Sequence, residues 1–122
     1  MKLMIVDDSN VIRRKIERSA HIGKLEVVGM APDGVSAVKL CQQTDPDLVT
    51  MDLTMPHMDG IQCIEQLVAI KPSLLILVVS ALSDKATAIE ALKKGAHGFL
   101  CKPFTEDELS DALDELLRGS RK

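Results

Sequence analysis

The chain has 122 residues, and 15 Lys and Arg against 18 Asp and Glu leave a net charge of −3. This length suits one domain that folds without disulfides or a structural metal, and an apolar fraction of 46% excludes a disordered chain. The mildly acidic balance argues against direct nucleic-acid binding. The longest apolar run, Leu74 to Val79, is too short for membrane insertion.

The three cysteines, Cys41, Cys63 and Cys101, are odd in number and widely spaced, which predicts reduced thiols rather than a disulfide framework or a zinc site. The N-terminus also lacks the pattern of a signal peptide. Together these features predict a cytoplasmic protein.

Short apolar segments alternate with longer segments of helical period along the whole chain. The apolar segments predict strands at Lys2–Val6, Leu25–Met30, Asp47–Met51, Leu74–Val79 and His97–Cys101. The periodic segments predict helices at Asn10–Ala20, Gly34–Gln43, Gly60–Ile70, Lys85–Lys94 and Glu106–Arg118.

This alternation predicts an α/β fold in which a parallel sheet carries helices on both faces. The runs Leu3–Val6 and Leu74–Val79 are nearly all apolar, as expected of central strands, whereas the second and fifth strands carry Glu, Gly or His and suit edges. These positions agree with the flavodoxin-like, doubly wound, five-stranded order 2-1-3-4-5. We expect one domain over residues 1–118, followed by a short basic tail over 119–122.

Polar residues follow the predicted strands at their carboxyl ends, where open α/β sheets bind ligands. Asp7 and Asp8 follow the first strand and Asp52 the third, while Ser80 follows the fourth and Lys102 the fifth. Simpler interpretations exist: the paired aspartates could cap the first helix, although Ser9 is available for that role. Asp52 could be a turn residue, and Lys102-Pro103 a surface turn whose proline permits a cis peptide bond.

Taken together, these residues predict a site for Mg²⁺ and a phosphoryl group. Three neighbouring carboxylates repel one another unless a cation compensates them. Magnesium prefers hard oxygen ligands and completes its shell with water and phosphate oxygens. An aspartate can also act as a nucleophile and form an acyl phosphate, and Asp52 is the best candidate because it ends an apolar strand.

The chain resembles the receiver domains of two-component response regulators from about Met1 to Leu117. The resemblance rests on Asp7-Asp8, Asp52, Ser80-Ala81, Lys102-Pro103 and the segment Met55–Gly60 after the candidate nucleophile. It implies a phosphorylation-activated switch, not a dedicated enzyme, whose own catalysis is limited to phosphotransfer and slow autodephosphorylation. No sequence resembling an output domain follows, which suggests a single-domain regulator of the chemotaxis type.

The resemblance implies a role for each matching residue. Asp52 would accept the phosphoryl group, and Mg²⁺ would be held by Asp8, by Asp7 mainly through water, by Asp52 and by the backbone carbonyl of Thr54. Lys102 would pair with the phosphoryl oxygens and Ser80 would donate a hydrogen bond to them. Phe99 would be the switch aromatic; it lacks the hydroxyl of a tyrosine, and Ser80 replaces the more frequent threonine.

The implied partners are a sensor histidine kinase or phosphotransfer protein and a downstream target that binds the face of the fourth helix, fifth strand and fifth helix. A homodimer formed on phosphorylation is left open.

The alternatives are a phosphatase using Asp52, although Thr54 stands where a second aspartate would be expected, and a flavin mononucleotide carrier, although the chain has no Trp or Tyr. A receiver fold that binds proteins without phosphorylation is a third. The basic run Arg13-Arg14-Lys15 is interpreted as a solvated helix face.

Overall fold

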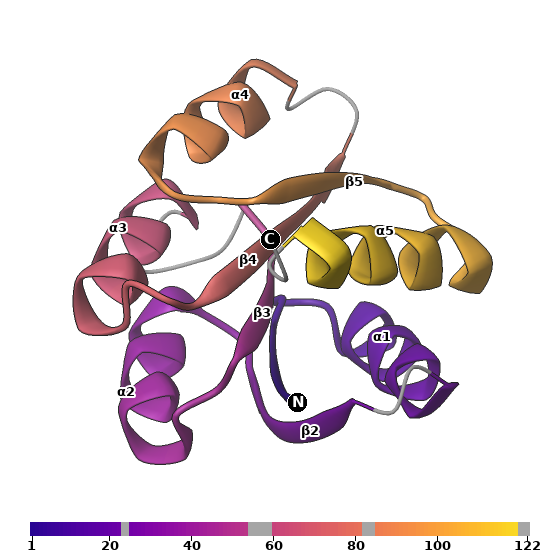
Figure 1. The fold of residues 1–122 in the computed structure, drawn as a ribbon, viewed down its shortest axis with the longest axis horizontal. Coiled ribbons are helices and arrows are strands. Elements are labelled where there is room, and N and C mark those ends of the chain that lie inside the picture. Colours follow the sequence, from indigo (N-terminus) through magenta and orange to yellow (C-terminus); the bar gives the residue numbers. More distant parts are fainter. Residues whose placement is uncertain (23–24, 54–59, 82–84, 120–122) are drawn as a thin grey trace.

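The computed structural model describes residues 1–22, 25–53, 60–81 and 85–119. Five parallel strands form one sheet in the order β2-β1-β3-β4-β5, which confirms the predicted doubly wound fold (Figure 1). The strands are β1 (Lys2–Val6), β2 (Glu26–Ala31), β3 (Leu48–Met51), β4 (Leu75–Ala81) and β5 (Gly98–Lys102).

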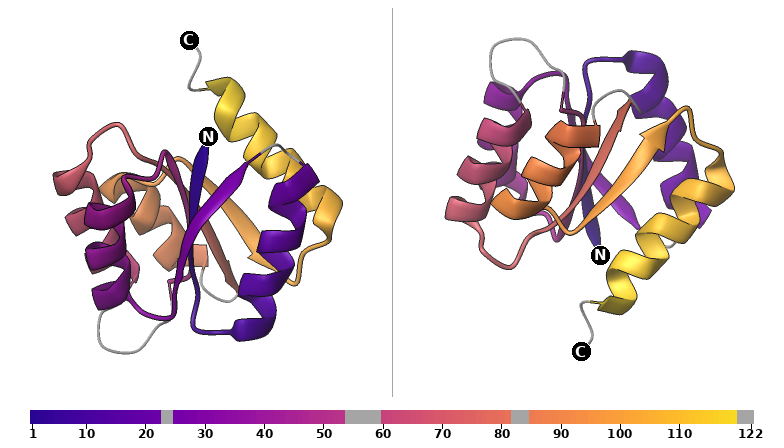
Figure 2. Two further views of the ribbon diagram at one scale, coloured as in Figure 1. Left: turned by 90° about the horizontal axis from the view of Figure 1, so that it is seen from below. Right: turned by 90° about the horizontal axis from the view of Figure 1, so that it is seen from above.

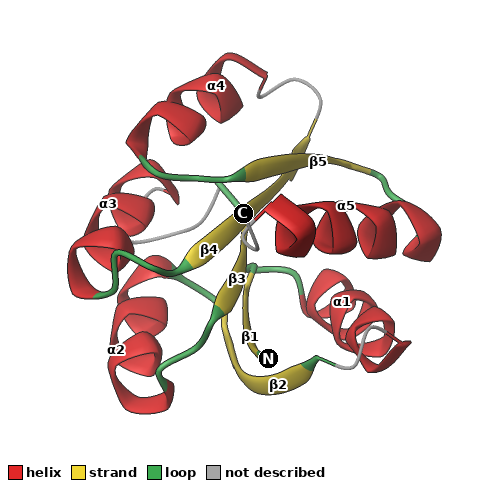
Figure 3. Ribbon diagram, in the orientation of Figure 1, coloured by secondary structure: helices red, strands yellow, loops and turns green. Residues whose placement is uncertain are grey.

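The helices cover both faces of the sheet, with α1 and α5 on one face and the other three helices on the opposite face (Figures 1 and 2). Their bounds are α1 (Asn10–Ile22), α2 (Gly34–Thr44), α3 (Gly60–Ile70), α4 (Lys85–Lys94) and α5 (Glu106–Gly119). Strands and helices alternate throughout the described part of the chain (Figure 3).

Alternate residues of the central strands supply two separate hydrophobic cores, because successive side chains of a strand point to opposite faces. Met4 and Val6 of β1 join the core beneath α2, α3 and α4. Leu3 and Ile5 join the core beneath α1 and α5. Burial of β1 on both faces explains why its sequence is an apolar run without alternation.

Side-chain caps fix where the helices begin. Thr105 Oγ1 accepts a hydrogen bond from the backbone N–H of Glu108, while the Glu108 carboxylate accepts one from the N–H of Thr105. This pair of reciprocal bonds is a capping box at the start of α5. Ser9 Oγ accepts from the N–H of Ile12 at the start of α1, so Ser9 caps this helix and the two preceding aspartates are available for another role.

The bounds of β1 are as predicted, and those of the other four strands differ from the predictions by one or two residues. The pairing of β4 with β5 continues to Ala81 and Lys102, so Ser80 and Lys102 lie inside the ends of their strands instead of following them. At the start of β2, pairing with β1 begins at Glu26 and is offset between Leu3 and Met4. Such shifts are expected because strand ends depend on the neighbouring strand.

The cysteines are all reduced thiols outside disulfides, as predicted, with Cys41 and Cys63 buried and Cys101 half-buried. Burial raises the pKa of the Cys41 thiol, which keeps it protonated and unreactive at neutral pH. Among the described residues, no helix combines the length and apolar character needed to cross a bilayer.

Candidate functional site

The carboxylates of Asp7, Asp8 and Asp52 gather at the carboxyl end of the sheet. Each offers an oxygen within 4.8 Å of the other two. Asp7 and Asp8 directly follow β1, and Asp52 directly follows β3, its neighbour in the sheet. The backbone N–H of Asp52 donates to the carbonyl oxygen of Val6 at 2.9 Å, which joins the two strand ends beneath the carboxylates.

The three aspartates have different surroundings. Asp7 is 1% exposed and Asp52 is 4% exposed, whereas Asp8 is exposed to solvent. Asp7 Oδ1 accepts a hydrogen bond from the N–H of Ser9 at 2.9 Å, and Asp7 Oδ2 lies 2.9 Å from the ammonium nitrogen of Lys102. Both oxygens of Asp7 are therefore engaged, while Asp8 presents its carboxylate at the open side of the cluster.

Lys102 supplies the positive charge of the site from the end of β5. Besides Asp7, its ammonium nitrogen lies 3.7 Å from Asp52 Oδ1. The peptide bond between Lys102 and Pro103 is cis. Since β5 is an edge strand separated from β3 by β4, Lys102 reaches across the end of β4 to meet the carboxylates.

The remaining predicted residues lie on β4 and β5. Ser80 is buried near the end of β4 and is in register with Cys101 of β5. Phe99 is partly buried and packs against the core beneath α2, α3 and α4. Thr54 lies outside the described residues, so its carbonyl is not placed.

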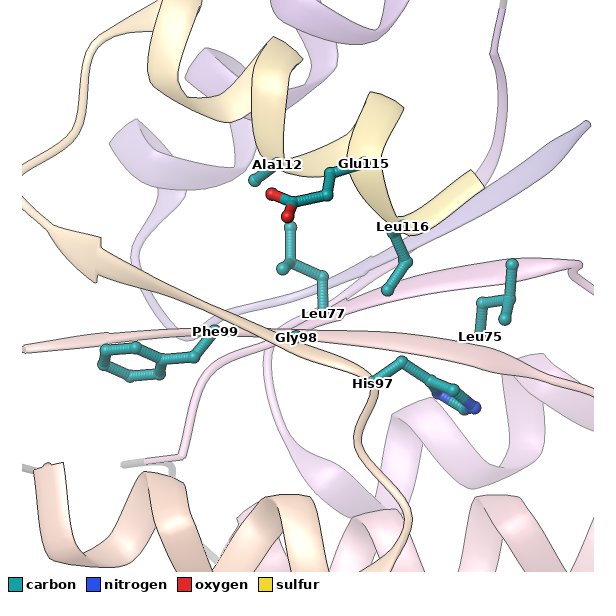
Figure 4. Close-up of a pocket in the computed structure, with 8 residues that line it drawn as sticks. All are labelled: Leu75, Leu77, His97, Gly98, Phe99, Ala112, Glu115 and Leu116. Carbon is teal, nitrogen blue, oxygen red and sulfur yellow. The ribbon is translucent and has the colours of Figure 1, made fainter. Parts of the chain in front are cut away.

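A groove of about 470 Å³ lies between β4, β5 and α5, and Phe99 is among the residues that line it. Figure 4 shows Leu75, Leu77 and Leu116 on the α5 side of the strands and the Phe99 ring on the opposite side. Phe99 thus contributes to the edge of the groove, while its ring lies on the side of the strands away from α5.

Gly60 is a site residue whose role the sequence did not reveal. Its N–H donates to the carbonyl oxygen of Leu53 at 3.1 Å. A Cβ atom at this position would lie 2.5 Å from Leu53 Cα and 2.8 Å from the carbonyl oxygen of Asp52. Only glycine lets α3 begin this close to the backbone that carries Asp52. An isolated glycine at the start of a helix gives no sequence signal for such a contact.

The interpretation of Arg13-Arg14-Lys15 as a solvated face is wrong for two of the three residues. Arg13 donates from Nη1 to the carbonyl oxygen of Asp7 at 2.5 Å, and Lys15 donates to the carbonyl oxygen of Phe104. Arg14 alone is exposed. Basic side chains have long stems that can reach buried carbonyls, and sequence position alone does not show which of them do so.

The cluster has the chemistry of a magnesium site. Its ligands are carboxylate oxygens, which Mg²⁺ prefers, and one of the three carboxylates is open to solvent, where the ion could keep several waters. Lys102 stands beside the same oxygens and can pair with an anionic group that joins the cation. The residues therefore fit the combination of Mg²⁺ and phosphoryl group expected from the sequence.

Comparisons with known proteins agree with this geometry. The model of the response regulator receiver domain family matches residues 3–114. The chain is 39% identical over 115 residues to the chemotaxis protein CheY of Listeria monocytogenes, covering 94% of this chain and 97% of that protein. The CheY protein of Thermotoga maritima is 38% identical, with 94% and 96% covered.

Solved structures show the same fold. The structure of a CheX–CheY–BeF₃–Mg²⁺ complex from Borrelia burgdorferi superposes with a TM-score of 0.90 at 27% identity, covering 96% of this chain and 89% of that one. The response regulator domain of Thermotoga maritima CheB gives a TM-score of 0.85 at 29% identity, with 100% and 97% covered.

Proposed function

Because this chain belongs to the response regulator receiver domain family of two-component systems, we propose that it is a switch activated by phosphorylation of Asp52. The observation that carries the proposal is the meeting of three aspartates and one lysine from three different strand ends. Receiver domains bind Mg²⁺ at an acidic pocket, and the cluster of Asp7, Asp8 and Asp52 has that composition.

Asp52 is the proposed phosphoryl acceptor. One of its carboxylate oxygens attacks the phosphorus atom of a phosphohistidine or a small acyl phosphate, and a P–O bond to Asp52 forms as the donor's P–N or P–O bond breaks. The donor leaves as imidazole, which takes up a proton, or as a carboxylate. Water later hydrolyses the acyl phosphate, which releases inorganic phosphate and restores the Asp52 carboxylate, so the signal decays without a second enzyme.

Asp8 is the proposed direct ligand of Mg²⁺ together with Asp52, because its carboxylate is exposed, while Asp7 acts mainly through bound water because both of its oxygens are engaged. The carbonyl of Thr54 is proposed as a further ligand from the family pattern. When bound, Mg²⁺ neutralises charge on the carboxylates and on the transferring phosphoryl oxygens. Lys102 then exchanges part of its pairing with Asp7 for the new phosphoryl oxygens.

Ser80 and Phe99 are the proposed coupling residues. Ser80 gains a phosphoryl acceptor for its hydroxyl only in the modified state, and this differential contact is what a two-state switch requires. Phe99 packs on the α4 side of β5, so a movement there would change the face formed by α4, β5 and α5. That face is proposed to bind the downstream target, and a sensor kinase or phosphotransfer protein would supply the phosphoryl group.

Intact-protein mass spectrometry tests the proposal directly. The chain is incubated with acetyl phosphate or phosphoramidate, with and without Mg²⁺. We expect a Mg²⁺-dependent mass gain of one phosphoryl group in the wild type and in Asp111→Asn, an exposed acid on α5, and none in Asp52→Asn. In Asp8→Ala, Mg²⁺ should bind more weakly. A wild type that gains no mass with any donor would overturn the proposal.

A second observation concerns the partner. The solved complex from Borrelia burgdorferi contains CheX, CheY, BeF₃ and Mg²⁺. Beryllofluoride is therefore a suitable phosphoryl mimic for capturing targets of this chain. Proteins retained by the wild type only in the presence of beryllofluoride and Mg²⁺, and not by Asp52→Asn, would be its activated-state partners.

A further inference from the structure

Lys15 makes two contacts with a single residue 89 positions away in the chain. Its ammonium donates to the carbonyl oxygen of Phe104, and the same nitrogen lies 4.5 Å from the centroid of the Phe104 ring. Phe104 is 3% exposed and Lys15 is half-buried. A charge-assisted hydrogen bond combined with a cation–π contact fixes both partners more firmly than an ordinary surface lysine would.

The segment held by Lys15 is the one that follows the site lysine. Lys102 ends β5, Pro103 follows through a cis bond, and Phe104 comes next, immediately before the cap of α5. Lys102 has a long side chain with many rotamers, so the place of its ammonium depends on where its backbone is held. The backbone just beyond it is held by the carbonyl contact from α1.

The same helix also holds the other side of the site. Two residues before Lys15, Arg13 donates to the carbonyl oxygen of Asp7 at 2.5 Å. Helix α1 lies beside α5 on one face of the sheet (Figure 2). Neighbouring side chains near the start of α1 therefore contact both the backbone of Asp7 at the end of β1 and the connection that follows Lys102.

We propose that Lys15 is a positioning residue that keeps the connection from β5 to α5 in place, so that the ammonium of Lys102 stays beside the carboxylates and meets the phosphoryl oxygens. Lys15 acts through Lys102 and does not touch the phosphoryl group. The inference rests on the proposed function, because it assigns a role in phosphoryl binding. It also assigns a role to a side chain that the sequence analysis interpreted only as part of a solvated helix face.

The test compares binding of beryllofluoride at saturating Mg²⁺ with binding of Mg²⁺ alone, both by isothermal titration calorimetry. Lys15→Met keeps the aliphatic stem and removes the donor, and Lys15→Gln is a second variant in case the first does not fold. Lys15→Arg restores a cationic donor. Arg14→Met is the matched control, because Arg14 is exposed on the same helix turn. Urea denaturation of every variant records any general loss of stability.

We expect Lys15→Met to weaken beryllofluoride binding by about tenfold, which corresponds to about 1.4 kcal/mol. Binding of Mg²⁺ alone should not weaken, because a displaced Lys102 ammonium competes less with the cation for the carboxylates. Lys15→Arg should recover most of the loss, and Arg14→Met should behave as the wild type. In a Lys102→Met background, Lys15→Met should have no further effect on beryllofluoride binding, because the residue it positions is gone.

Equal beryllofluoride affinities for Lys15→Met and Arg14→Met would overturn the inference. So would an undiminished effect in the Lys102→Met background, since Lys15 would then act by general stabilisation of the fold. Failure of the proposed function looks different: the wild type itself would bind no beryllofluoride in the presence of Mg²⁺.

Discussion

Replacing Lys102 with methionine removes the ammonium that lies beside two buried carboxylates. Its nitrogen is 2.9 Å from Asp7 Oδ2 and 3.7 Å from Asp52 Oδ1. At an effective dielectric constant near 20, the gross attraction is about 6 kcal/mol for the closer pair and about 4 kcal/mol for the other. Desolvation of the charges offsets much of this attraction.

The net cost of the change follows from the exposure of the partners. Removing one member of a buried ion pair typically costs about 3–5 kcal/mol, because the other charge is left uncompensated. The Lys102 side chain is 22% exposed, whereas those of Asp7 and Asp52 are 1% and 5% exposed. We therefore expect Lys102→Met to lower the free energy of unfolding by about 3 kcal/mol without Mg²⁺, the lower end of that range.

Magnesium should restore most of the lost free energy of unfolding, because the bound cation compensates the charge of the carboxylates in place of the ammonium. At saturating Mg²⁺ we expect a loss of about 1 kcal/mol, and the difference of about 2 kcal/mol corresponds to about thirtyfold tighter Mg²⁺ binding by the variant. Urea denaturation with and without Mg²⁺ measures both free energies, and calorimetric titration measures the affinity independently.

Lys71 offers a matched control at the opposite end of the sheet. Its ammonium lies 3.0 Å from Asp45 and 3.7 Å from Asp47, and its side chain is 20% exposed. Lys71→Met removes two ion pairs with similar distances, but their carboxylates are 78% and 42% exposed. Its cost should therefore be smaller than that of Lys102→Met and should not depend on Mg²⁺. If Lys102→Met also lost the same stability at both Mg²⁺ concentrations, charge compensation among the site aspartates would be refuted.

Two further predictions concern the backbone beside the site and the acid dependence of stability. Gly60→Ala should lower the free energy of unfolding by about 1–3 kcal/mol and weaken Mg²⁺ binding, because its Cβ would lie 2.8 Å from the carbonyl oxygen of Asp52. The control Gly98→Ala should have smaller effects in denaturation and Mg²⁺ titration, because the added Cβ meets only side-chain atoms. Equal effects of the two variants would contradict the argument. The N–H of Lys2 donates to Asp47 and lowers the pKa of that carboxyl from its ordinary 3.8, so its stabilising contribution is complete above pH 3.8 and is lost as the pH falls through the lower folded-state value. Thermal unfolding of Asp47→Asn across this range should be less acid-sensitive than that of the wild type, and parallel curves would argue against this linkage.

Much of the site followed from the sequence because strand ends are local features. In a parallel sheet, all carboxyl ends meet at one edge, so the polar residues at the ends of β1, β3 and β5 had to be neighbours once the strands were assigned. The acids Asp7, Asp8 and Asp52 do lie together, and Lys102 does reach them. Periodicity likewise located the helices, with errors of one or two residues at some ends.

Contacts between segments that are distant in the chain could not be predicted from such local sequence patterns. The closeness of Gly60 to the backbone at Asp52 depends on how α3 approaches the sheet, and the contact of Lys15 with Phe104 depends on how α1 lies against the start of α5. Both arise from packing of elements whose relative position no local pattern specifies.

The order of residue types along this chain is enough to specify alternating strands and helices, and to bring oxygens and an amine to one edge of a sheet, because backbone periodicity and parallel pairing are regular. Which basic side chains on α1 hold carbonyls and which face water was decided only when the helices packed. Arg13, Arg14 and Lys15 are chemically alike and adjacent, but consecutive side chains of a helix point in directions about 100° apart. The orientation of α1 in the packed structure therefore decides which neighbours each of them reaches.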